Sequence, residues 1–481
     1  MTKKKNKEGL SIKKEENFSE WYQELIIKSE LADYTNVSGC IVFRPHAYAI
    51  WEILQKFIDK EFKKIGVKNA YFPLLIPEDT LSKEEEHVKG FTPEVAWVTQ
   101  TGNTKLAKKL AIRPTSETII YESYSKWIRS WRDLPLKLNL WNNVVRWEFK
   151  HPVPFLRTRE FLWNEGHHAY SDKKELEKDK DSILKIYSSF LKDHMALPSL
   201  LGKKTDKEKF AGAESTYSLE LYLPNGKAIQ GPDYHDDGQN FAKAYNIKFK
   251  DKNGKENFVY QSTYAITTRM LGIMFAIHSD NNGLVLPPKM AENQIVIIPI
   301  MFEKNKKILK QAKEIKKSFS KYNPILDDRL EITPGKKYHE WELKGIPLRI
   351  EIGPKDLEKK EVILARRDNG KKNPIKIKDL KKNIENELKS MQESLLKKAE
   401  RLLESNIEKS DNFKDALKKI KDNKIVLVPL KNSKEVEDIL KDKTQGVKTL
   451  NIPLKQPPIK NKKCIISNEQ ADYWVYIGKS Y

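Results

Sequence analysis

Cysteine, long apolar runs and glycine-rich nucleotide loops are scarce in this chain. Its 481 residues include two cysteines, Cys40 and Cys464, too few for a disulfide framework or an all-cysteine metal site. No segment approaches the ~20 apolar residues that cross a bilayer, and no apolar run follows the lysine-rich N-terminus. We therefore expect a cytoplasmic protein in a reducing compartment, with no membrane partner and no export.

No loop has the P-loop spacing, and no dinucleotide fingerprint follows a strand. A bound nucleotide would therefore have to be held by arginines, whose guanidinium groups stay charged and bind phosphate in a bidentate way. Arg146, Arg157 and Arg269 form the natural set. The 89 Lys and Arg residues exceed the 67 Asp and Glu residues, giving a formal net charge of +22. This favours a polyanionic partner such as nucleic acid, although an AT-rich genome would also explain abundant lysine.

The length suits about three domains. We expect a charged tail over residues 1–17, a large domain over 18–286, a compact α/β domain over 287–400 in which strands and helices alternate, and a small α/β domain over 401–481. A long amphipathic helix is predicted over 46–65, a strand over 67–77, a charged helix over 171–197 and mostly helix over 376–420. The helix and strand around Pro73 could form a dimer seam or pack within one subunit.

Residues 144–170 predict two strands joined by the loop 150–159. Strand periodicity places Arg146 and Glu148 on one face of the first strand, and Trp163, Glu165 and His167 on one face of the second. Such a hairpin would suit a small zwitterion beside a polyphosphate. Its charges could equally be satisfied as ordinary cross-strand pairs.

Three further segments carry polar groups. In residues 113–118, a Thr or Ser before Glu117 is usually a helix cap. Residues 234–240 could hold a metal, but a turn with solvated carboxylates is the simpler interpretation. In residues 261–288, Thr267 or Thr268 would cap a helix with Arg269 in its first turn, which is a ready anion site unless Arg269 belongs to an ordinary buried helix.

Five motifs, in this order, resemble those of a known family. They are SGCIVFRPHAYAIWE (38–52), RPTSET (113–118), VVRWEF with PFLRTREFLWNEGH (144–149 and 154–167), TTR followed by GLVLPP (267–269 and 283–288), and EWELKGIPLRIEIGPKD (340–356). From about Phe18 to Tyr481 the chain resembles the prolyl-tRNA synthetases of the archaeal and eukaryotic type, which are class II aminoacyl-tRNA synthetases.

The resemblance implies an α/β (α+β) fold with a six- or seven-stranded antiparallel catalytic sheet, an α/β anticodon-binding domain and a small C-terminal α/β domain. It also implies a homodimer and the partners tRNA(Pro), ATP and L-proline, with Mg²⁺ accompanying ATP. Proline would first form prolyl-adenylate, and the prolyl group would then pass to the 3′ end of the tRNA.

Residue roles follow from the same resemblance. The catalytic residues would be Arg146 and Arg269, with Arg146 between the proline carboxylate and the α-phosphate. ATP would be bound by Arg146, Glu148, Arg157, Gln230, Thr268 and Arg269, with Glu220 as a weaker Mg²⁺ ligand. Proline would be bound by Thr115, Glu117, Arg146, Trp163, Glu165, His167, Phe210, His235 and Thr263. The anticodon would be read by Glu340, Arg349, Lys355 and Asp356.

The chain departs from the family pattern at three places. Ser467 stands at the Cys-x-x-Cys partner of Cys464, so zinc is unlikely. Thr263-Tyr264-Ala265 replaces Ser-Trp-Gly, which could alter the proline floor, and Asp236-Asp237 is expected to favour protonated His235. The tail 478–481 does match, and in relatives that tail reaches toward the active site. Residues 171–260 are too few to add an editing domain to the sheet.

Discrimination against smaller amino acids by size is weak, at ~1–3 kcal/mol per methylene, so we expect some alanine activation. Two other hypotheses stay open. The chain could be a synthetase-like protein that binds RNA or a partner without catalysis, or a synthetase for threonine, serine or histidine.

Overall fold

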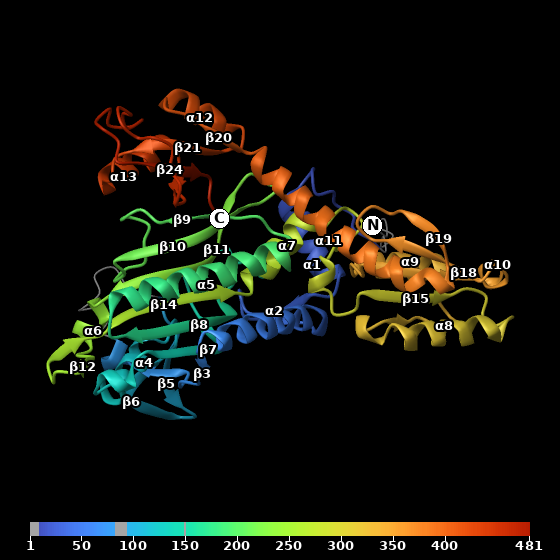
Figure 1. The fold of residues 1–481 in the computed structure, drawn as a ribbon, viewed down its shortest axis with the longest axis horizontal. Helices are drawn as coiled ribbons and strands as arrows, with labels where there is room; N and C mark the ends of the chain where they lie inside the picture. The colour runs from blue at the N-terminus through green and yellow to red at the C-terminus, as the bar shows by residue number, and fades with distance from the viewer. Residues whose placement is uncertain (1–8, 82–93, 149–150) are drawn as a thin grey trace.

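An eight-stranded sheet forms the centre of the larger lobe (Figure 1). The computed structural model of the chain describes residues 9–81, 94–148 and 151–481. Across the sheet the strands are β23 (Ile452–Pro453), β9 (Leu200–Lys203), β10 (Ser215–Tyr222), β11 (Ala228–Gly238), β14 (Tyr260–Thr267), β8 (Glu160–Tyr170), β7 (Leu136–Val145) and β3 (Lys68–Asn69). Neighbours are antiparallel from β23 to β7, whereas β3 is parallel to β7. The predicted antiparallel character is confirmed, but the sheet has eight strands in place of the expected six or seven, because two-residue strands pair at both edges, and one of these comes from the C-terminal part of the chain.

Helices cover one face of this sheet. They are α1 (Phe18–Lys28), α2 (Pro45–Lys64), α5 (Lys173–Asp193) and α7 (Arg269–His278), and their apolar sides share one core cluster with the sheet. In α2 the buried residues Ile50, Leu54, Ile58 and Phe62 recur every four positions, which gives one apolar stripe. The helices predicted over 46–65 and 171–197 are therefore confirmed, the second one being shorter than predicted.

The opposite face is covered at one end by α4 (Glu117–Trp127) and α6 (Asn240–Ala244), which pack with the β7 and β8 residues Leu138 and Ala169. Two small hairpins flank the sheet, β1 (Ala32–Tyr34) with β2 (Ile41–Phe43) and β12 (Lys248–Lys250) with β13 (Glu256–Phe258). The remainder of this face carries the polar side chains described below.

The strand predicted over residues 67–77 is wrong as a single element. Its first part, β3, pairs with β7, whereas β4 (Leu75–Pro77) pairs with β6 (Thr104–Ile112) in a separate sheet that also contains β5 (Trp97–Thr101). Pro73 lies between the two parts, and a residue without an N–H suits such a break. The segment thus joins two sheets.

A second domain-sized unit holds a five-stranded sheet. Its strand order is β16 (Ile325–Leu326), β15 (Ile295–Pro299), β17 (Leu348–Ile352), β18 (Glu361–Arg366) and β19 (Lys372–Lys376), flanked by α8 (Lys306–Ser318), α9 (Pro334–Leu343) and α10 (Pro354–Glu358). β15, β16 and β17 are parallel, and β18 and β19 run antiparallel to their neighbours. The predicted alternation of strands and helices is confirmed.

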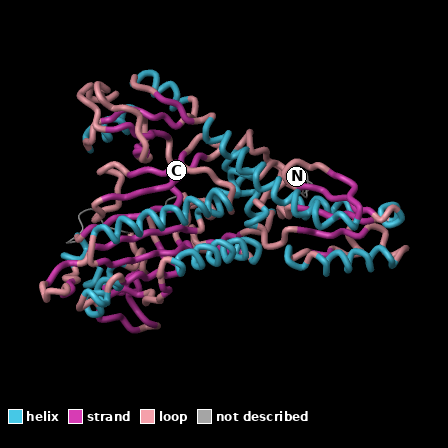
Figure 2. Tube along the Cα trace, viewed as in Figure 1, coloured by secondary structure: helices cyan, strands magenta, loops and turns pink. Residues whose placement is uncertain are grey.

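The long helix α11 (Leu380–Glu404) runs from this unit to the C-terminal part of the chain (Figure 1 and Figure 2). There a four-stranded sheet has the order β20 (Ile407–Lys409), β21 (Ile425–Leu430), β24 (Tyr473–Gly478) and β22 (Lys448–Thr449), with α12 (Phe413–Lys421) and α13 (Lys434–Lys443). β20 interrupts the stretch that we predicted as helical over 376–420. Among the described residues, no helix is both long and apolar enough to cross a membrane.

Candidate active site

Three adjoining cavities open on the uncovered part of the large sheet. The inner cavity, about 210 Å³, is lined by Thr115, Glu117, Arg146, Trp163, Glu165, His167, Glu208, Phe210, Thr216, His235 and Thr263, among others. The middle cavity, about 140 Å³, shares Arg146, Trp163 and Asp233 with it. The outer cavity, about 190 Å³, shares Leu156 and Arg269 with the middle one. Gln230 lines all three, so a ligand could extend from one to the next.

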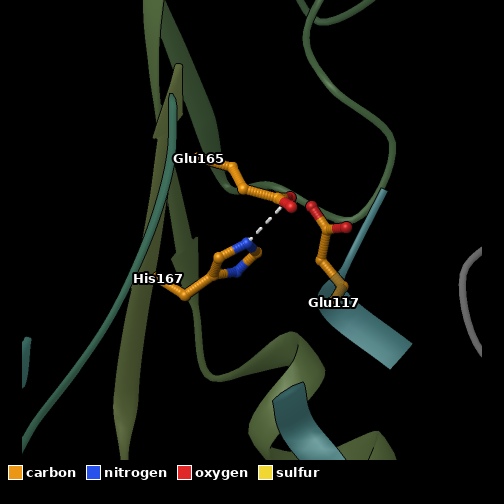
Figure 3. A group of neighbouring side chains, drawn as sticks. All are labelled: Glu117, Glu165 and His167. Atoms are coloured by element: carbon orange, nitrogen blue, oxygen red, sulfur yellow. Dashed lines mark hydrogen bonds and ion pairs between the residues drawn. The ribbon is translucent and has the colours of Figure 1, made fainter. Parts of the chain in front are cut away.

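Glu117, Glu165 and His167 meet in the inner cavity (Figure 3). Glu165 and His167 are two apart on β8 and so share a face, while Glu117 begins α4. Nε2 of His167 donates to Glu165 Oε2 at 3.2 Å. Burial acts to raise the pKa of Glu165, but the hydrogen bond and charge of His167 outweigh it, and the pKa lies below its usual range. Glu165 is thus held as a carboxylate.

These three residues place one possible ligand atom each within 4.8 Å of one another, which would also suit a metal ion. Glu165, however, already accepts hydrogen bonds from Ser116 N at 3.2 Å, from the Ser116 hydroxyl and from Asn142 Nδ2 at 2.9 Å, besides His167. Glu117 accepts from the Thr115 hydroxyl. Carboxylates so occupied suit an ammonium group, which brings its own donors, better than a metal.

The Ser116 contact corrects one prediction. We interpreted a hydroxyl before Glu117 as a helix cap, and Ser116 does stand at the N-cap of α4, but its side chain makes no capping hydrogen bond. Its hydroxyl donates to Glu165 instead. The segment therefore links the helix to β8 within the site.

His235 forms another wall of the inner cavity. Its Nδ1 lies 2.9 Å from the hydroxyl oxygen of Thr216, which also accepts from Phe210 N. The Phe210 ring lies over it with centroids 4.7 Å apart. Burial lowers the pKa of His235, more than Asp233 raises it. The expected protonated form is therefore wrong, and His235 is a neutral group.

The prediction of a solvated turn at residues 234–240 is also wrong. Residues 234–238 belong to β11, and the Asp237 side chain is fully buried. Burial, with the charge of Glu117, raises the pKa of Asp237 well above its ordinary value. Asp236 and Asp237 are therefore buried strand residues, and not the solvated carboxylates that the sequence suggested.

Arg146 separates the inner and middle cavities. β7 ends at Val145, so the prediction that Arg146 to Phe149 continue the strand is wrong for the described residues, and Phe149 and Lys150 lie outside them. Nε of Arg146 donates to Pro114 O at 2.9 Å, and its guanidinium lies 5.3 Å from the Trp163 ring centroid. This fixes the group while leaving other donors for a ligand.

Arg269 joins the middle and outer cavities at the first residue of α7. Nε donates to Leu156 O at 3.1 Å and Nη1 to Gln230 O at 3.3 Å. Thr268 stands at the N-cap of α7 but makes no side-chain capping hydrogen bond, whereas Thr267 Oγ1, one residue earlier, accepts from Arg269 N at 3.1 Å. Burial lowers the pKa of Arg269. A guanidinium at a helix N-terminus gives a strong anion site.

The outer cavity combines both charge signs. Arg157, Arg269, Lys204 and Lys448 line it together with Glu208 and Glu220. Lys204 Nζ donates to Glu220 Oε1 at 2.6 Å, and the Ser218 hydroxyl donates to the same oxygen at 2.8 Å. Cations beside the Glu220 carboxylate are a donor set that would suit a polyphosphate with Mg²⁺, which binds few protein groups besides phosphates and water.

Some predicted residues lie elsewhere. Glu148 is exposed and Thr268 is buried, and neither lines one of the three cavities. Conversely, the sequence interpretation missed Asp233, Lys204 and Lys448. Asp233 could have been found, because it lies two residues before His235 on a strand and so shares its face.

The candidate anticodon residues lie in the five-stranded unit. Glu340 is on α9, where its Oε2 accepts from Arg329 Nη2 at 2.9 Å. Arg349 on β17 donates to Glu351 and Glu342, both at 2.9 Å. Lys355 and Asp356 lie on α10, and Asp356 Oδ2 accepts from Gly353 N at 2.8 Å.

At the turn where the family pattern has a zinc site, Cys464 is joined by Ser467 in place of a second cysteine, a donor set that does not fit zinc. Cys464 is buried, Ser467 N lies 3.5 Å from its sulfur, and Cys464 N donates to Glu469 O at 2.7 Å. Cys464 also packs in an apolar cluster with Val428 and Val475. Backbone hydrogen bonds and apolar packing hold this turn.

The antiparallel sheet and the arginine-lined cavities define a class II aminoacyl-tRNA synthetase. Three family models match in chain order: tRNA synthetase class II core domain (G, H, P, S and T) over residues 98–278, Anticodon binding domain over 294–387, and Prolyl-tRNA synthetase, C-terminal, over 413–481.

Relatives narrow the assignment. The chain is 43% identical over 489 residues to the cytoplasmic proline–tRNA ligase of Arabidopsis thaliana, covering 100% of this chain and 92% of that protein. It is 44% identical over 471 residues to proline–tRNA ligase 2 of Bacillus cereus, covering 98% of each. It is 40% identical over 507 residues to the bifunctional glutamate/proline–tRNA ligase of Mus musculus, covering 100% of this chain and 33% of that protein. The chain belongs to the proline–tRNA ligase family, which confirms the predicted resemblance.

Proposed function

We propose that this chain activates L-proline with ATP and transfers the prolyl group to the 3′ end of tRNA(Pro). The observation that carries the proposal is the position of Arg146, which separates a cavity lined by Glu117, Glu165 and His167 from one that leads to Arg269. A zwitterion and a polyphosphate could thus lie on either side of one guanidinium.

Within this proposal the inner cavity holds proline. Its secondary ammonium meets Thr115 and Glu117, and its ring lies among other lining residues, namely Trp163, Glu165, His167, Phe210, His235 and Thr263. A neutral His235 adds no charge to repel the ammonium. A fixed pocket of this kind aligns a small rigid substrate with its reaction partner.

ATP occupies the middle and outer cavities. The proline carboxylate oxygen attacks the α-phosphorus, the bond to the β-phosphate oxygen breaks, and pyrophosphate leaves with the electron pair. Arg146 neutralises charge at the carboxylate and α-phosphate, Arg157 and Arg269 bind the outer phosphates, and Gln230 borders both substrates. Glu148 near adenine and Thr268 beside Arg269 are weaker proposals, because neither side chain lines a cavity. In the second step a ribose hydroxyl of the tRNA takes the prolyl group and AMP leaves.

Mg²⁺ bound with ATP would neutralise negative charge on the phosphates. Glu220 is the protein group that we propose beside it. The ammonium group of Lys204 already neutralises part of the charge of this carboxylate. Glu220 would therefore be a minor ligand of a metal held mainly by phosphate oxygens and water.

We propose a homodimer formed by α2 and the segment around Pro73, because Tyr48, Tyr71 and Leu75 expose 43%, 75% and 40% of their surfaces. Large apolar side chains exposed on the two elements that the family resemblance assigns to the dimer contact support this proposal. We also propose cytoplasmic localisation, as for the Arabidopsis relative, divisions near residues 18, 287 and 401, and anticodon contacts by Glu340, Arg349, Lys355 and Asp356.

ATP–pyrophosphate exchange with a panel of amino acids tests the first step, and charging of tRNA(Pro) tests the second. We expect exchange to depend on proline, with weaker exchange for alanine. Stronger exchange with threonine, serine or histidine would show a different specificity. No exchange at saturating Mg²⁺ would favour a binding protein without catalysis.

A further inference from the structure

The outer cavity has walls from two distant parts of the chain. β10, β11 and α7 supply Glu220, Gln230 and Arg269, while the C-terminal unit supplies Lys448, Thr449 and Tyr481. Lys448 is the first residue of β22, and its ammonium nitrogen lies 3.7 Å from Glu208 Oε2. A cation from the last 81 residues (401–481) thus faces the same cavity as Arg269.

Buried hydrogen bonds fix this position. Glu437 Oε2 on α13 accepts from the hydroxyl of Thr449 at 2.5 Å and from the hydroxyl of Thr205 at 3.1 Å. Burial raises the pKa of Glu437. Because Thr205 follows Lys204 and Thr449 follows Lys448, this junction holds two lysines in the lining of one cavity.

Backbone hydrogen bonds reinforce the junction. β23 pairs with β9, Ala228 N donates to Lys479 O at 2.8 Å, and Tyr481 N donates to Ala228 O at 3.0 Å. The C-terminal unit therefore continues the catalytic sheet, and its side chains have a defined place relative to Arg269.

The present partner of Lys448 is a weak one. The lysine side chain is 44% exposed, and its distance of 3.7 Å to Glu208 exceeds that of a hydrogen bond. Exposed ion pairs of this kind contribute little. A phosphate offers several charged acceptors and would compete successfully with Glu208 for the ammonium. In contrast, Lys204 is buried against Glu220 at 2.6 Å and is already engaged.

We propose that Lys448 binds the terminal phosphates of ATP and the pyrophosphate that leaves, so that the C-terminal unit completes the nucleotide site. This rests on the proposed function. Lys448 stays protonated throughout. It balances the negative charge that builds on the leaving pyrophosphate as its bond to the α-phosphorus breaks, in concert with Arg157 and Arg269.

The test compares Lys448→Ala and Lys448→Arg with Lys441→Ala, an exposed lysine on α13 of the same unit. In the exchange assay, Lys448→Ala should raise KM for ATP about 5-fold to 30-fold, with KM for proline and the unfolding midpoint unchanged. Lys448→Arg should recover most of the affinity, and Lys441→Ala should match the wild type. An unchanged KM for ATP in Lys448→Ala would overturn the proposal. A parallel rise in both KM values with a lower unfolding midpoint would overturn it too, because it would show a structural role.

Binding of inorganic pyrophosphate, measured by calorimetry on the full chain, separates this proposal from the proposed function. The measurement needs no amino acid activation. If the wild type lacked proline-dependent exchange, the proposed function would fail, while weaker pyrophosphate binding by Lys448→Ala would still support the phosphate contact. If the wild type showed normal proline-dependent exchange and Lys448→Ala bound pyrophosphate as tightly as the wild type, the role of Lys448 would be rejected and the proposed function would stand.

Discussion

Both terminal nitrogens of Arg367 donate to the carboxylate of Asp280, at 2.6 and 2.9 Å. Asp280 lies two residues after the end of α7, whose first residue is Arg269. Arg367 follows β18, and its Nε donates to Glu342 O on α9 at 2.8 Å. One guanidinium thus connects the far end of α7 with the helix that carries Glu340.

Asp280→Ala should weaken this connection. The Arg367 side chain, 4% exposed, would lose its bidentate partner, which we expect to lower the free energy of unfolding by about 1–3 kcal/mol. Charging of tRNA should fall more than ATP–pyrophosphate exchange, because exchange does not require the anticodon-binding unit. Denaturant unfolding and the two kinetic assays measure this. Asp181→Ala, at a carboxylate 79% exposed on α5, is the control, and equal losses in both assays would contradict the prediction.

Glu117→Gln should impair proline binding selectively. The substitution keeps the size of the side chain and a hydrogen-bond acceptor but removes the charge that faces the substrate ammonium. A charged hydrogen bond lost in a buried site corresponds to a KM for proline about 10-fold to 100-fold higher, with KM for ATP nearly unchanged. Steady-state exchange at varied proline and varied ATP distinguishes the two. Glu122→Gln, on the same helix outside the inner cavity, is the control and should resemble the wild type. If Glu117→Gln raised KM for ATP as much as KM for proline, a specific contact of Glu117 with the proline ammonium would be contradicted.

The periodicity of side chains along the sequence predicted those structural features that depend only on residues close together in the chain. The shared face of Trp163, Glu165 and His167 and the amphipathic helix α2 follow from side-chain spacing. The family motifs then named most residues that line the inner cavity.

Distant partners explain what local pattern missed. β7 ends at Val145, and two residues further on Trp147 N donates to Glu94 O at 3.0 Å, a hydrogen bond to a segment 53 positions earlier. The Ser116 hydroxyl does not cap α4 but donates a hydrogen bond to Glu165, 49 residues away. Lys448 lines the same cavity as Arg269 only through packing of the C-terminal unit against β9 and β11. No local spacing encodes these contacts.

His278 should make the protein sensitive to acid. Its ring is buried, Nε2 donates to Met195 O at 2.9 Å, and burial lowers its pKa to about 4. Between pH 6.5 and 4 the unfolded chain binds the proton and the folded chain does not, so stability is complete above about pH 6.5 and falls as the pH drops. This one residue should cost up to about 3 kcal/mol near pH 4. Chemical denaturation from pH 8 to 4 measures the slope.

His278→Gln should flatten that slope, because glutamine can donate to Met195 O without titrating. His194, whose pKa burial also lowers to about 4, should leave part of the acid sensitivity in place. Adding His194→Gln should then remove a further part. If His278→Gln lost stability with acid as steeply as the wild type, the sensitivity would have another origin.

Gly166→Ala should distort the proline site from behind. Gly166 lies between Glu165 and His167, and strand alternation turns it to the opposite face, where a Cβ would lie 1.9 Å from Cζ of Tyr264. The Tyr264 ring cannot retreat easily, because it is buried, stacks with Tyr234 at 6.2 Å and donates its hydroxyl to His168 Nε2 at 2.7 Å. We expect about 3 kcal/mol of destabilisation and a higher KM for proline.

Gly335→Ala is the matched control, since a Cβ there meets nothing within 4 Å and the residue lies in α9. Alanine should leave stability unchanged or raise it by about 0.5–1 kcal/mol in a helix. Thermal unfolding and exchange kinetics compare the two variants, and equal stability would show that β8 can shift. The Tyr264 side chain supports β8 from the face opposite the cavity. A loss of stability and of proline affinity in Gly166→Ala alone would therefore mean that Tyr264, in Thr263-Tyr264-Ala265, shapes the proline floor through the backbone of β8.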